Sequence, residues 1–187
     1  MKRAFDILAI LAAAPAWLPI LLLTALAVRL VEGSPVFFTQ ERAGLKGRPF
    51  RMVKFRTMKS GYGSDATRLT RFGRFLRATS LDELPELFHV LSGRMSLVGP
   101  RPLPVVYLPR YTPEQMRRHD VPPGITGWAQ IHGRNATTWQ ERFAHDIWYV
   151  DHATFGLDLK ILIATVCMVF AARGISKPGQ ATMEEFK

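Results

Sequence analysis

A short acidic stretch in a basic chain is the first feature that could carry chemistry. Residues 80–86 read Ser-Leu-Asp-Glu-Leu-Pro-Glu, so three carboxylates fall within five residues, and a Gly-Pro-Arg-Pro turn follows at 99–102. An ionised carboxylate can act as a nucleophile or hold a magnesium ion. It can equally cap a helix, because an acid in the first turn interacts favourably with the positive end of the helix dipole.

The position of Pro85 decides which residue of this stretch would be the better helix cap. Ser80 and Glu83 match a capping box, but a cap at Ser80 would place Pro85 fifth in the helix, where its missing donor breaks a hydrogen bond. A cap at Asp82 would place Pro85 in the first turn, where backbone donors have no helical partner. We therefore expect Asp82 to cap a helix over 84–91. The local pattern does not separate a cap from a catalytic carboxylate.

Several basic side chains stand where they could bind phosphate. Arginine suits phosphate because its planar guanidinium donates to two oxygens at once. Two of the arginines, in Gly-Pro-Arg-Pro and Gly-Arg-Asn, follow Pro or Gly in short turns and would be better clamps than arginines on a mobile face. Taken singly, each is more often a solvated surface charge. The candidates are Lys54, Arg77, Arg101 and Arg134.

Composition limits the class of protein. The 187 residues fit one domain, and 25 Lys and Arg against 15 Asp and Glu give a formal net charge of +10. This balance favours an anionic partner such as nucleic acid, anionic lipid or a phosphorylated small molecule. The single cysteine, Cys167, lies in an apolar run, so we expect a packed core thiol and neither a disulfide nor a structural zinc site.

An apolar run near the N-terminus is long enough to cross a bilayer. Residues 7–28 are 22 residues without a charge. Pro15 and Pro19 should kink this helix, because each removes a backbone donor and clashes with the preceding turn. Basic residues flank both ends, and positive charge tends to stay cytoplasmic. The residues alone allow a kinked spanning helix, which is the commoner case, or a re-entrant helix that enters and leaves on one face.

The remaining chain is predicted to be helical around a small sheet. Two β-prone runs flank a glycine-containing turn in residues 36–58, which predicts a β-hairpin. A short basic helix or irregular stretch over 68–78, an aromatic-rich helix over 137–150 and an apolar helix over 157–173 follow. The last two would pack in the core or lie in the membrane interface. In the aromatic-rich helix, spacings of four, four and three place these residues on one face: Trp139, Phe143, Ile147 and Val150.

Six motifs follow one another along nearly the whole chain. They are Phe38-Thr-Gln40, Lys54-Phe-Arg-Thr-Met58, Ser80 to Phe88, Met95 to Pro102, Arg118 to Gly127, and Gly133-Arg-Asn135. Together they resemble those of the small monotopic phosphoglycosyl transferases, a bacterial sugar transferase family that starts membrane glycoconjugate assembly. An ordered series of long motifs is far more specific than a lone Asp-Glu pair.

The resemblance implies a fold, a reaction and a location. It implies a predominantly helical α+β protein, with a re-entrant membrane helix in 1–35 and a cytoplasmic catalytic domain in 36–187 that carries a small β-hairpin and interfacial amphipathic helices. Such enzymes transfer a sugar 1-phosphate from a UDP-sugar to polyprenyl (undecaprenyl) phosphate and release UMP. The implied location is the cytoplasmic face of the bacterial inner membrane, on anionic lipid. The oligomeric state stays open, including a homodimer.

The resemblance also implies roles for individual residues. The family mechanism is ping-pong, through a covalent phosphosugar intermediate on the aspartate of an Asp-Glu pair. That aspartate matches Asp82 and its neighbour matches Glu83, with Mg2+ serving the pair and the diphosphate. Glu83 is left open as a metal ligand or a proton acceptor. The residues implied to organise phosphate are Lys54, Arg77, Arg101, Arg134 and Asp146.

The family's re-entrant helix bends at a Ser-Pro pair, and the matching pair here is Leu18-Pro19. Because the proline is kept, we expect the break at Pro19, with a contribution from Pro15. The serine hydroxyl that could bond a freed backbone carbonyl is missing. The resemblance favours the re-entrant arrangement over the spanning one.

Other classes fit parts of the sequence. The basic balance permits a membrane-anchored nucleic-acid-binding protein, but no RNP-like motif or recognition-helix pattern occurs, so we expect no nucleic acid partner. A membrane-anchored scaffold, in which Asp82 is only a cap, is a second alternative. A kinase or nucleotidase would need a glycine-rich phosphate loop, and neither GxxxxGK[ST] nor GxGxxG is present.

Overall fold

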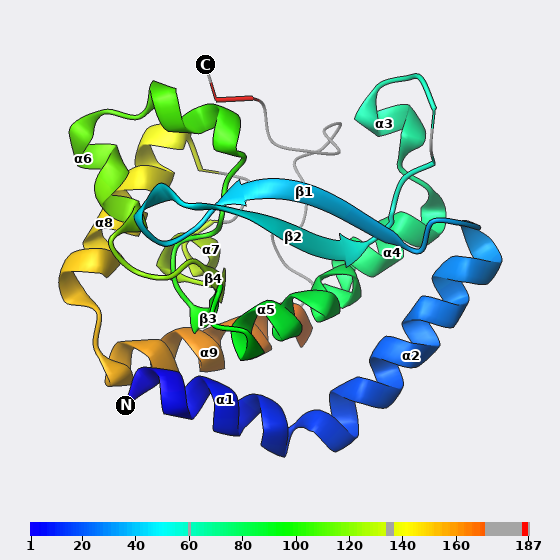
Figure 1. Ribbon diagram of the computed structural model, residues 1–187, viewed down its shortest axis with the longest axis horizontal. Helices are drawn as coiled ribbons and strands as arrows, with labels where there is room; N and C mark the ends of the chain where they lie inside the picture. The colour runs from blue at the N-terminus through cyan, green and yellow to red at the C-terminus, as the bar shows by residue number, and fades with distance from the viewer. Residues whose placement is uncertain (60, 134–136, 171–184, 187) are drawn as a thin grey trace.

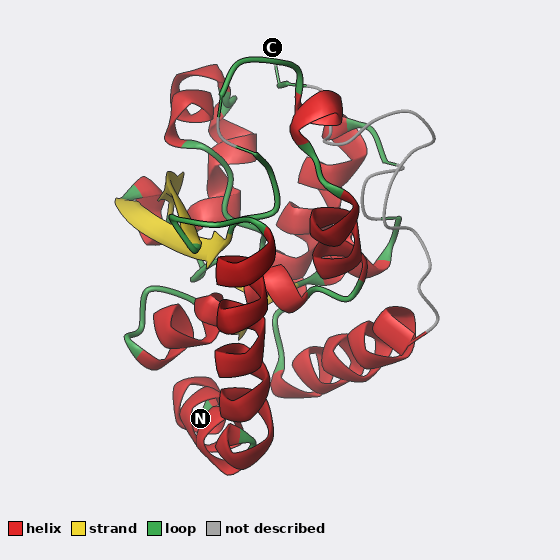
Figure 2. Cartoon of the chain, turned by 90° about the vertical axis from the view of Figure 1, so that its right-hand side faces the viewer, coloured by secondary structure: helices red, strands yellow, loops and turns green. Residues whose placement is uncertain are grey.

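Helices dominate the fold. The computed structural model describes residues 1–59, 61–133, 137–170 and 185–186. Within these residues the strands form two small sheets of two strands each, and helices surround them (Figure 1). Figure 2 shows the strands as a minor part of the molecule, set against a body of helices. The predicted class, a predominantly helical α+β fold, is confirmed.

Most of the elements are short, and the longest helices cover residues 14–31, 139–152 and 155–170. The α-helices are α1 (Lys2–Ala12), α2 (Ala14–Val31), α3 (Asp65–Arg68), α4 (Arg71–Ala78), α5 (Leu87–Leu91), α6 (Pro113–Met116), α7 (Trp128–Ile131), α8 (Trp139–His152) and α9 (Phe155–Phe170). The 3-10 helices are η1 (Leu45–Gly47), η2 (Leu81–Glu86), η3 (Val105–Arg110) and η4 (Arg117–His119). The strands are β1 (Phe37–Ala43), β2 (Pro49–Phe55), β3 (Ser96–Val98) and β4 (Gly124–Thr126).

The predicted hairpin is confirmed. Strands β1 and β2 pair antiparallel, with Phe38 opposite Lys54. Their connection includes Gly47 at φ +72°, a left-handed conformation that glycine adopts without a steric cost. In Figure 1 the hairpin runs across the middle of the view, with α5 below it. Since Lys54 is next to last in β2, the hairpin fixes this side chain over the acidic segment that follows in the chain.

A second sheet, which the sequence analysis did not predict, joins two distant segments. Strands β3 and β4 pair in parallel, with Ser96 opposite Gly124. The backbones beyond β3 approach so closely that a Cβ at Gly99 would lie 2.3 Å from the Pro122 carbonyl oxygen. Only glycine fits such a contact. This sheet therefore anchors the start of the Gly-Pro-Arg-Pro turn.

The N-terminal apolar segment forms two helices joined at an angle (Figure 1). Helix α1 ends at Ala12, α2 begins at Ala14, and Pro15 lies in the first turn of α2, where its missing donor has no helical partner to lose. Helix α2 continues through Pro19. The break therefore lies beside Pro15 and not at Pro19, where we expected it.

A tryptophan bonds a backbone carbonyl at this break. The Trp17 indole Nε1 donates to the Ile10 carbonyl oxygen at 2.9 Å, from one helix to the other. The indole is buried and packs edge-on against Phe88, with ring centroids 5.4 Å apart. A side chain of α2 thus supplies a donor of the kind that the missing serine hydroxyl would have offered.

The charged start of α1 is docked onto the rest of the fold. Lys2 Nζ donates to the Val98 carbonyl oxygen at 2.9 Å and to Asp158 Oδ2 at 2.5 Å. Asp6 is 3% exposed and accepts a hydrogen bond from Ser96 Oγ at 2.7 Å. The N-terminal helices also share one hydrophobic core with β2, α4 and α5. The segment before residue 36 and the segment after it are therefore packed as one body, while the functional division at residue 35 stays a prediction.

Exposed apolar side chains gather on the N-terminal helices and α9. Among the described helices, α2 is the one long and apolar enough to cross a membrane, and 22% of it is buried in the protein. A large exposed apolar surface marks contact with an apolar medium or a partner. The most exposed of these side chains on α1, α2 and α9 are Leu8, Leu22, Leu23, Leu26, Leu30, Val31, Ile163 and Val166.

Helix α8 buries a face that only partly matches its apolar one, and one prediction about α9 was wrong. The buried side chains of α8 are Arg142, Phe143, Asp146 and Tyr149, whereas Ile147 and Val150 are half-buried. Apolar residues at helical spacing do not identify this face, because it includes the buried polar side chains of Arg142 and Asp146. Such groups are tolerated in the interior when they find partners. Cys167 is exposed on α9, so it is not a core thiol.

Replacing Gly73 by alanine tests the packing that positions α4. A Cβ at Gly73 would lie 1.9 Å from the Thr57 carbonyl oxygen, so α4 would have to move away from the end of β2. We expect Gly73→Ala to lower the free energy of unfolding by about 1–3 kcal/mol, measured by denaturant unfolding in detergent. Gly156→Ala is the matched control, because a Cβ there meets nothing within 4 Å. Wild-type stability of Gly73→Ala would contradict this packing.

Candidate active site

The acidic segment folds as a 3-10 turn and not as the start of an α-helix. Ser80 precedes η2 with φ +57° and makes no side-chain cap bond. The Glu83 N–H donates to the Ser80 carbonyl oxygen at 3.1 Å, which closes the turn before the chain reaches Pro85. Asp82 lies inside this turn, so the prediction that it caps the helix was wrong. The tighter turn leaves the Asp82 carboxylate free for another role.

Glu83 accepts hydrogen bonds from two cations that come from different parts of the chain. Lys54 Nζ lies 2.6 Å from Glu83 Oε1, and Arg101 Nη2 lies 2.5 Å from the same oxygen. Burial alone would raise the pKa of Glu83, but Arg101 and Lys54 outweigh burial and hold it well below its usual range. Glu83 in turn raises the pKa of Arg101. This carboxylate is therefore ionised and joins β2, η2 and the Gly-Pro-Arg-Pro turn.

Glu86 is a third carboxylate of this cluster, and the sequence analysis gave it no role. Its side chain is 2% exposed, and Lys54 Nζ lies 3.0 Å from its Oε1. That contact lacks the angles of a hydrogen bond, so within the described chain Oε1 is buried without a hydrogen-bond donor. Burial raises the pKa of Glu86, although Lys54 opposes this. Its i+3 spacing from Glu83 is the signal that could have placed it beside Lys54.

Asp82 differs from both neighbouring acids. It is 7% exposed, and its carboxylate makes no hydrogen bond or ion pair with the part of the chain that the structure describes. Burial and the charge of Glu83 raise its pKa to about 7, while Lys54, Arg77 and Arg101 lower it less strongly. An acid in this setting can bind a metal, carry a proton or attack an electrophile, because none of its oxygens is engaged by a nearby donor of the described chain.

Arg77 reaches the cluster from α4. Its Nε donates to Thr57 Oγ1 at 3.0 Å, and Thr57 follows directly after β2 and Arg56. Burial lowers the pKa of Arg77, and the charge of Asp82 opposes that shift. The end of β2 and the helix α4 thus bring Arg77 close enough to Asp82 for each charge to affect the other.

The structure brings most of the predicted site residues together. Lys54, Arg77, Asp82, Glu83 and Arg101 form one cluster, as their contacts and mutual charge effects show. Asp146 lies apart from it, 2% exposed and 2.7 Å from Arg118, a residue to which the sequence analysis gave no role. Arg134 lies outside the described residues.

The carboxylates fit a magnesium ion only in part. Among the described residues no group of three His, Cys, Asp or Glu side chains could hold a metal. Asp82 has an unengaged carboxylate, and Glu83 has one oxygen that neither Lys54 nor Arg101 bonds. Mg2+ is commonly held by one or two carboxylates and completed by water and substrate phosphates. The donor set fits this pattern and does not fit a closed protein cage.

Comparison with known proteins places the chain among sugar transferases. Residues 1–172 match the family model described as "Bacterial sugar transferase". The chain is 52% identical to "Uncharacterized sugar transferase EpsL" of Bacillus subtilis (strain 168), over 100% of this chain and 95% of that protein.

Other relatives are named for an activity. The chain is 42% identical to a UDP-glucose:undecaprenyl-phosphate glucose-1-phosphate transferase of Xanthomonas campestris pv. campestris, over 89% of this chain and 38% of that protein. A protein of the same name from Caulobacter vibrioides is 41% identical, over 88% of this chain and 68% of that protein. The chain therefore spans well under half of one of these relatives and about two thirds of the other. With nearly its whole length matched, the chain belongs to the bacterial sugar transferase family.

Proposed function

We propose that this protein transfers a sugar 1-phosphate from a UDP-sugar to undecaprenyl phosphate and releases UMP. Two relatives are named as UDP-glucose:undecaprenyl-phosphate glucose-1-phosphate transferases, which describes this transfer for glucose 1-phosphate. The observation that carries the proposal is the Asp82 carboxylate, which is buried, unengaged within the described chain and set among Lys54, Arg77 and Arg101. A cap or a structural acid would be bonded to a neighbour, so the scaffold alternative does not account for this carboxylate.

In the first step Asp82 is the nucleophile. One carboxylate oxygen attacks the phosphorus that carries the sugar, the bond from that phosphorus to the bridging oxygen breaks, and UMP leaves with the bonding electron pair. The product is a phosphosugar joined to Asp82 as an acyl phosphate. An anion attacking a diphosphate is repelled, so the cations around Asp82 are needed to stabilise the charge that develops on the phosphate oxygens.

In the second step undecaprenyl phosphate takes the place of UMP. One of its phosphate oxygens attacks the same phosphorus, and the Asp82 carboxylate leaves as the anion. Covalent catalysis of this kind lets a water-soluble donor and a lipid acceptor use one site in turn. The site therefore needs to reach the lipid headgroup region and need not hold both substrates at once.

The charged neighbours of Asp82 have distinct proposed roles. Lys54 and Arg101 are held by Glu83 and would bind the diphosphate with their remaining donors. Arg77, and Arg134 from outside the described residues, are proposed as further phosphate ligands. Asp82 and the unbonded oxygen of Glu83 would hold Mg2+, which when bound supplies positive charge to the diphosphate.

We also propose that residues 1–35 enter and leave the membrane on the cytoplasmic face. Two observations support a re-entrant arrangement over a spanning one. Helix α1 and helix α2 are separate and meet at an angle at Ala13. Lys2, at the start of α1, is hydrogen-bonded to Val98 and Asp158, which belong to the body that follows the apolar segment. A spanning helix would separate these partners by the thickness of the bilayer.

Asp82→Asn tests the nucleophile. An amide is a poor nucleophile toward phosphorus, so we expect UMP release to fall below detection when a panel of UDP-sugars is offered with undecaprenyl phosphate and Mg2+. A labelled sugar phosphate should attach covalently to the wild-type protein and not to Asp82→Asn. Asp151→Asn, at an exposed ion pair with Arg117, is the control and should retain activity. Wild-type turnover by Asp82→Asn would rule out the covalent assignment.

The pKa of Asp82 sets the pH at which it can attack. Because burial raises this pKa to about 7, Asp82 is protonated below that pH in the folded protein and ionised above it. The nucleophilic form therefore falls by about tenfold per pH unit well below neutrality. In metal-free protein labelled with 13C at aspartate carboxyls, one resonance should titrate near pH 7 and be absent from Asp82→Asn. Midpoints below about pH 5 for every aspartate would contradict the shift.

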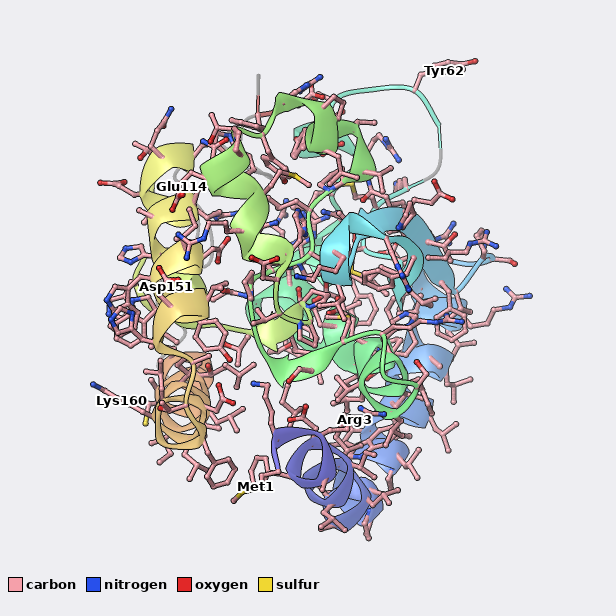
Figure 3. All side chains as sticks on the ribbon, turned by 60° about the vertical axis from the view of Figure 1, so that its left-hand side comes forward. Met1, Arg3, Tyr62, Glu114, Asp151 and Lys160 are labelled. Carbon is pink, nitrogen blue, oxygen red and sulfur yellow. The ribbon has the colours of Figure 1, made fainter. Side chains whose placement is uncertain are left out.

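Cysteine labelling tests the membrane arrangement. In a Cys167→Ala background, one cysteine is placed in a short tag before Lys2, and a second protein carries Tyr62→Cys on an exposed loop (Figure 3). We expect a membrane-impermeant maleimide to label neither protein in intact cells and both after the inner membrane is opened. Labelling of the tag alone in intact cells would show a spanning helix and overturn the re-entrant proposal.

A further inference from the structure

The turn that carries Arg101 is held almost entirely through its carbonyl oxygens. Pro100 and Pro102 have no N–H, so the backbone here has few donors of its own. Each of the four successive carbonyls from Pro100 to Leu103 accepts a hydrogen bond from elsewhere in the fold. The donors are, in chain order, Gly124 N at 3.0 Å, Arg118 Nη2 at 2.8 Å, Arg42 Nη1 at 3.2 Å and Ala43 N at 2.9 Å.

Arg118 is the donor to the carbonyl of Arg101 itself. Its guanidinium is engaged on two sides: Nε and Nη2 lie 3.0 and 2.7 Å from Asp146 Oδ2, and Nη2 also donates to the Arg101 carbonyl oxygen. The side chains of Arg118 and Asp146 are 1% and 2% exposed. Since Arg118 lies in η4 and Asp146 in α8, this buried pair ties α8 to the turn.

Aromatic rings fix the plane of this guanidinium. Its centre lies 5.9 Å from the ring centroid of Tyr111 and 5.7 Å from that of Phe143. Phe186 packs against both rings, at centroid distances of 5.7 and 5.1 Å. Arg118 therefore has almost no freedom to reorient without disturbing this aromatic cluster, and its hydrogen bond to the turn is fixed in direction.

We propose that Arg118 is a positioning residue for Arg101, and that Asp146 acts on the site only through Arg118. The proposal rests on the proposed function, in which Arg101 stabilises charge on the phosphate. Arg118 holds the backbone of Arg101, and Arg101 reaches Glu83 beside Asp82. Neither Arg118 nor Asp146 then needs to touch the substrate. The burial of both side chains agrees with this role, because substrate could not reach them.

The substitution Arg118→Lys separates the effect of charge from the effect of geometry. A lysine keeps the positive charge opposite Asp146, but its single ammonium lacks the planar fork that serves the carboxylate and the carbonyl together. Arg101 would then lose one backbone anchor while the buried charge stays paired. A misplacement of about 1 Å in a group that stabilises the transition state commonly lowers rate by about a hundredfold.

The experiment is a double-mutant cycle on UMP release. We expect Arg118→Lys to lower kcat by roughly 10- to 100-fold with a smaller change in KM, and Asp146→Asn to act in the same direction. In an Arg101→Ala background, adding Arg118→Lys should change kcat by less than about twofold, because the group that Arg118 positions is gone. A purely structural role would lower kcat by the same factor in both backgrounds, and that result would overturn the proposal.

Arg117→Lys is the matched control for this cycle. Arg117 is the neighbouring residue, and it pairs at the surface with Glu114 of α6 and Asp151 of α8, both labelled in Figure 3. It should retain wild-type kcat. All variants are compared at a temperature at which circular dichroism shows them folded.

A second readout does not depend on turnover. In protein labelled with 15N-arginine, the Nε–H signal of Arg101 is assigned by its loss in Arg101→Lys. Arg118→Lys should shift or broaden that signal, and Arg117→Lys should leave it unchanged. An unshifted Arg101 signal in folded Arg118→Lys would overturn the positioning role. If wild-type protein releases no UMP from any donor, the proposed function fails, and the Arg101 signal alone decides whether Arg118 positions Arg101.

Discussion

The shared hydrogen bonds of Glu83 are the interaction on which the site depends. Two cations from β2 and from the Gly-Pro-Arg-Pro turn meet on one carboxylate oxygen, so three segments far apart in the sequence are joined at one point. Removing one member of a partly buried charge cluster leaves the others uncompensated, which costs more than the pair contributes when intact. The same bonds keep Lys54 and Arg101 from pairing with Asp82. The nucleophile candidate is thus surrounded by positive charge that is already held in place.

The N-terminal helices pack against the elements that carry this cluster. Trp17 on α2 bonds the Ile10 carbonyl and packs on Phe88, which follows η2 in the chain. Leu21 and Val28 of α2 belong to the core that includes Phe55 at the end of β2. The helices that expose the most apolar surface are therefore in direct contact with the elements that carry Lys54 and Asp82. A protein that acts on a lipid phosphate needs such a contact, because the membrane-associated helices then fix the depth at which the active site lies.

Local sequence rules predicted the elements that depend on neighbours in the chain, and failed where distant segments decide. The hairpin over 36–58 was predictable because strand propensity and turn residues lie together. The parallel pair β3–β4 was not, since three-residue strands carry no periodicity and the two strands are not neighbours in the chain. The prediction that Asp82 caps a helix was wrong because it assumed an α-helix where a 3-10 turn forms. The order of the motifs predicted the residues of the cluster. Glu86 was missed although its i+3 spacing from Glu83 indicated it, and Arg118 was missed because its role comes from contacts that spacing does not reveal.

Two adjacent carboxylates with different environments suit a reaction in which one of them first attacks phosphorus and later leaves it. Glu83 is held ionised by its two cations, and burial leaves Asp82 with a pKa of about 7. Separation of this kind assigns different tasks to chemically similar groups. A carboxylate that is harder to ionise is more nucleophilic toward phosphorus but a poorer leaving group from the acyl phosphate. A pKa near neutrality is a compromise between these demands, and it is reached because Glu83, and not Asp82, takes the direct bonds of Lys54 and Arg101.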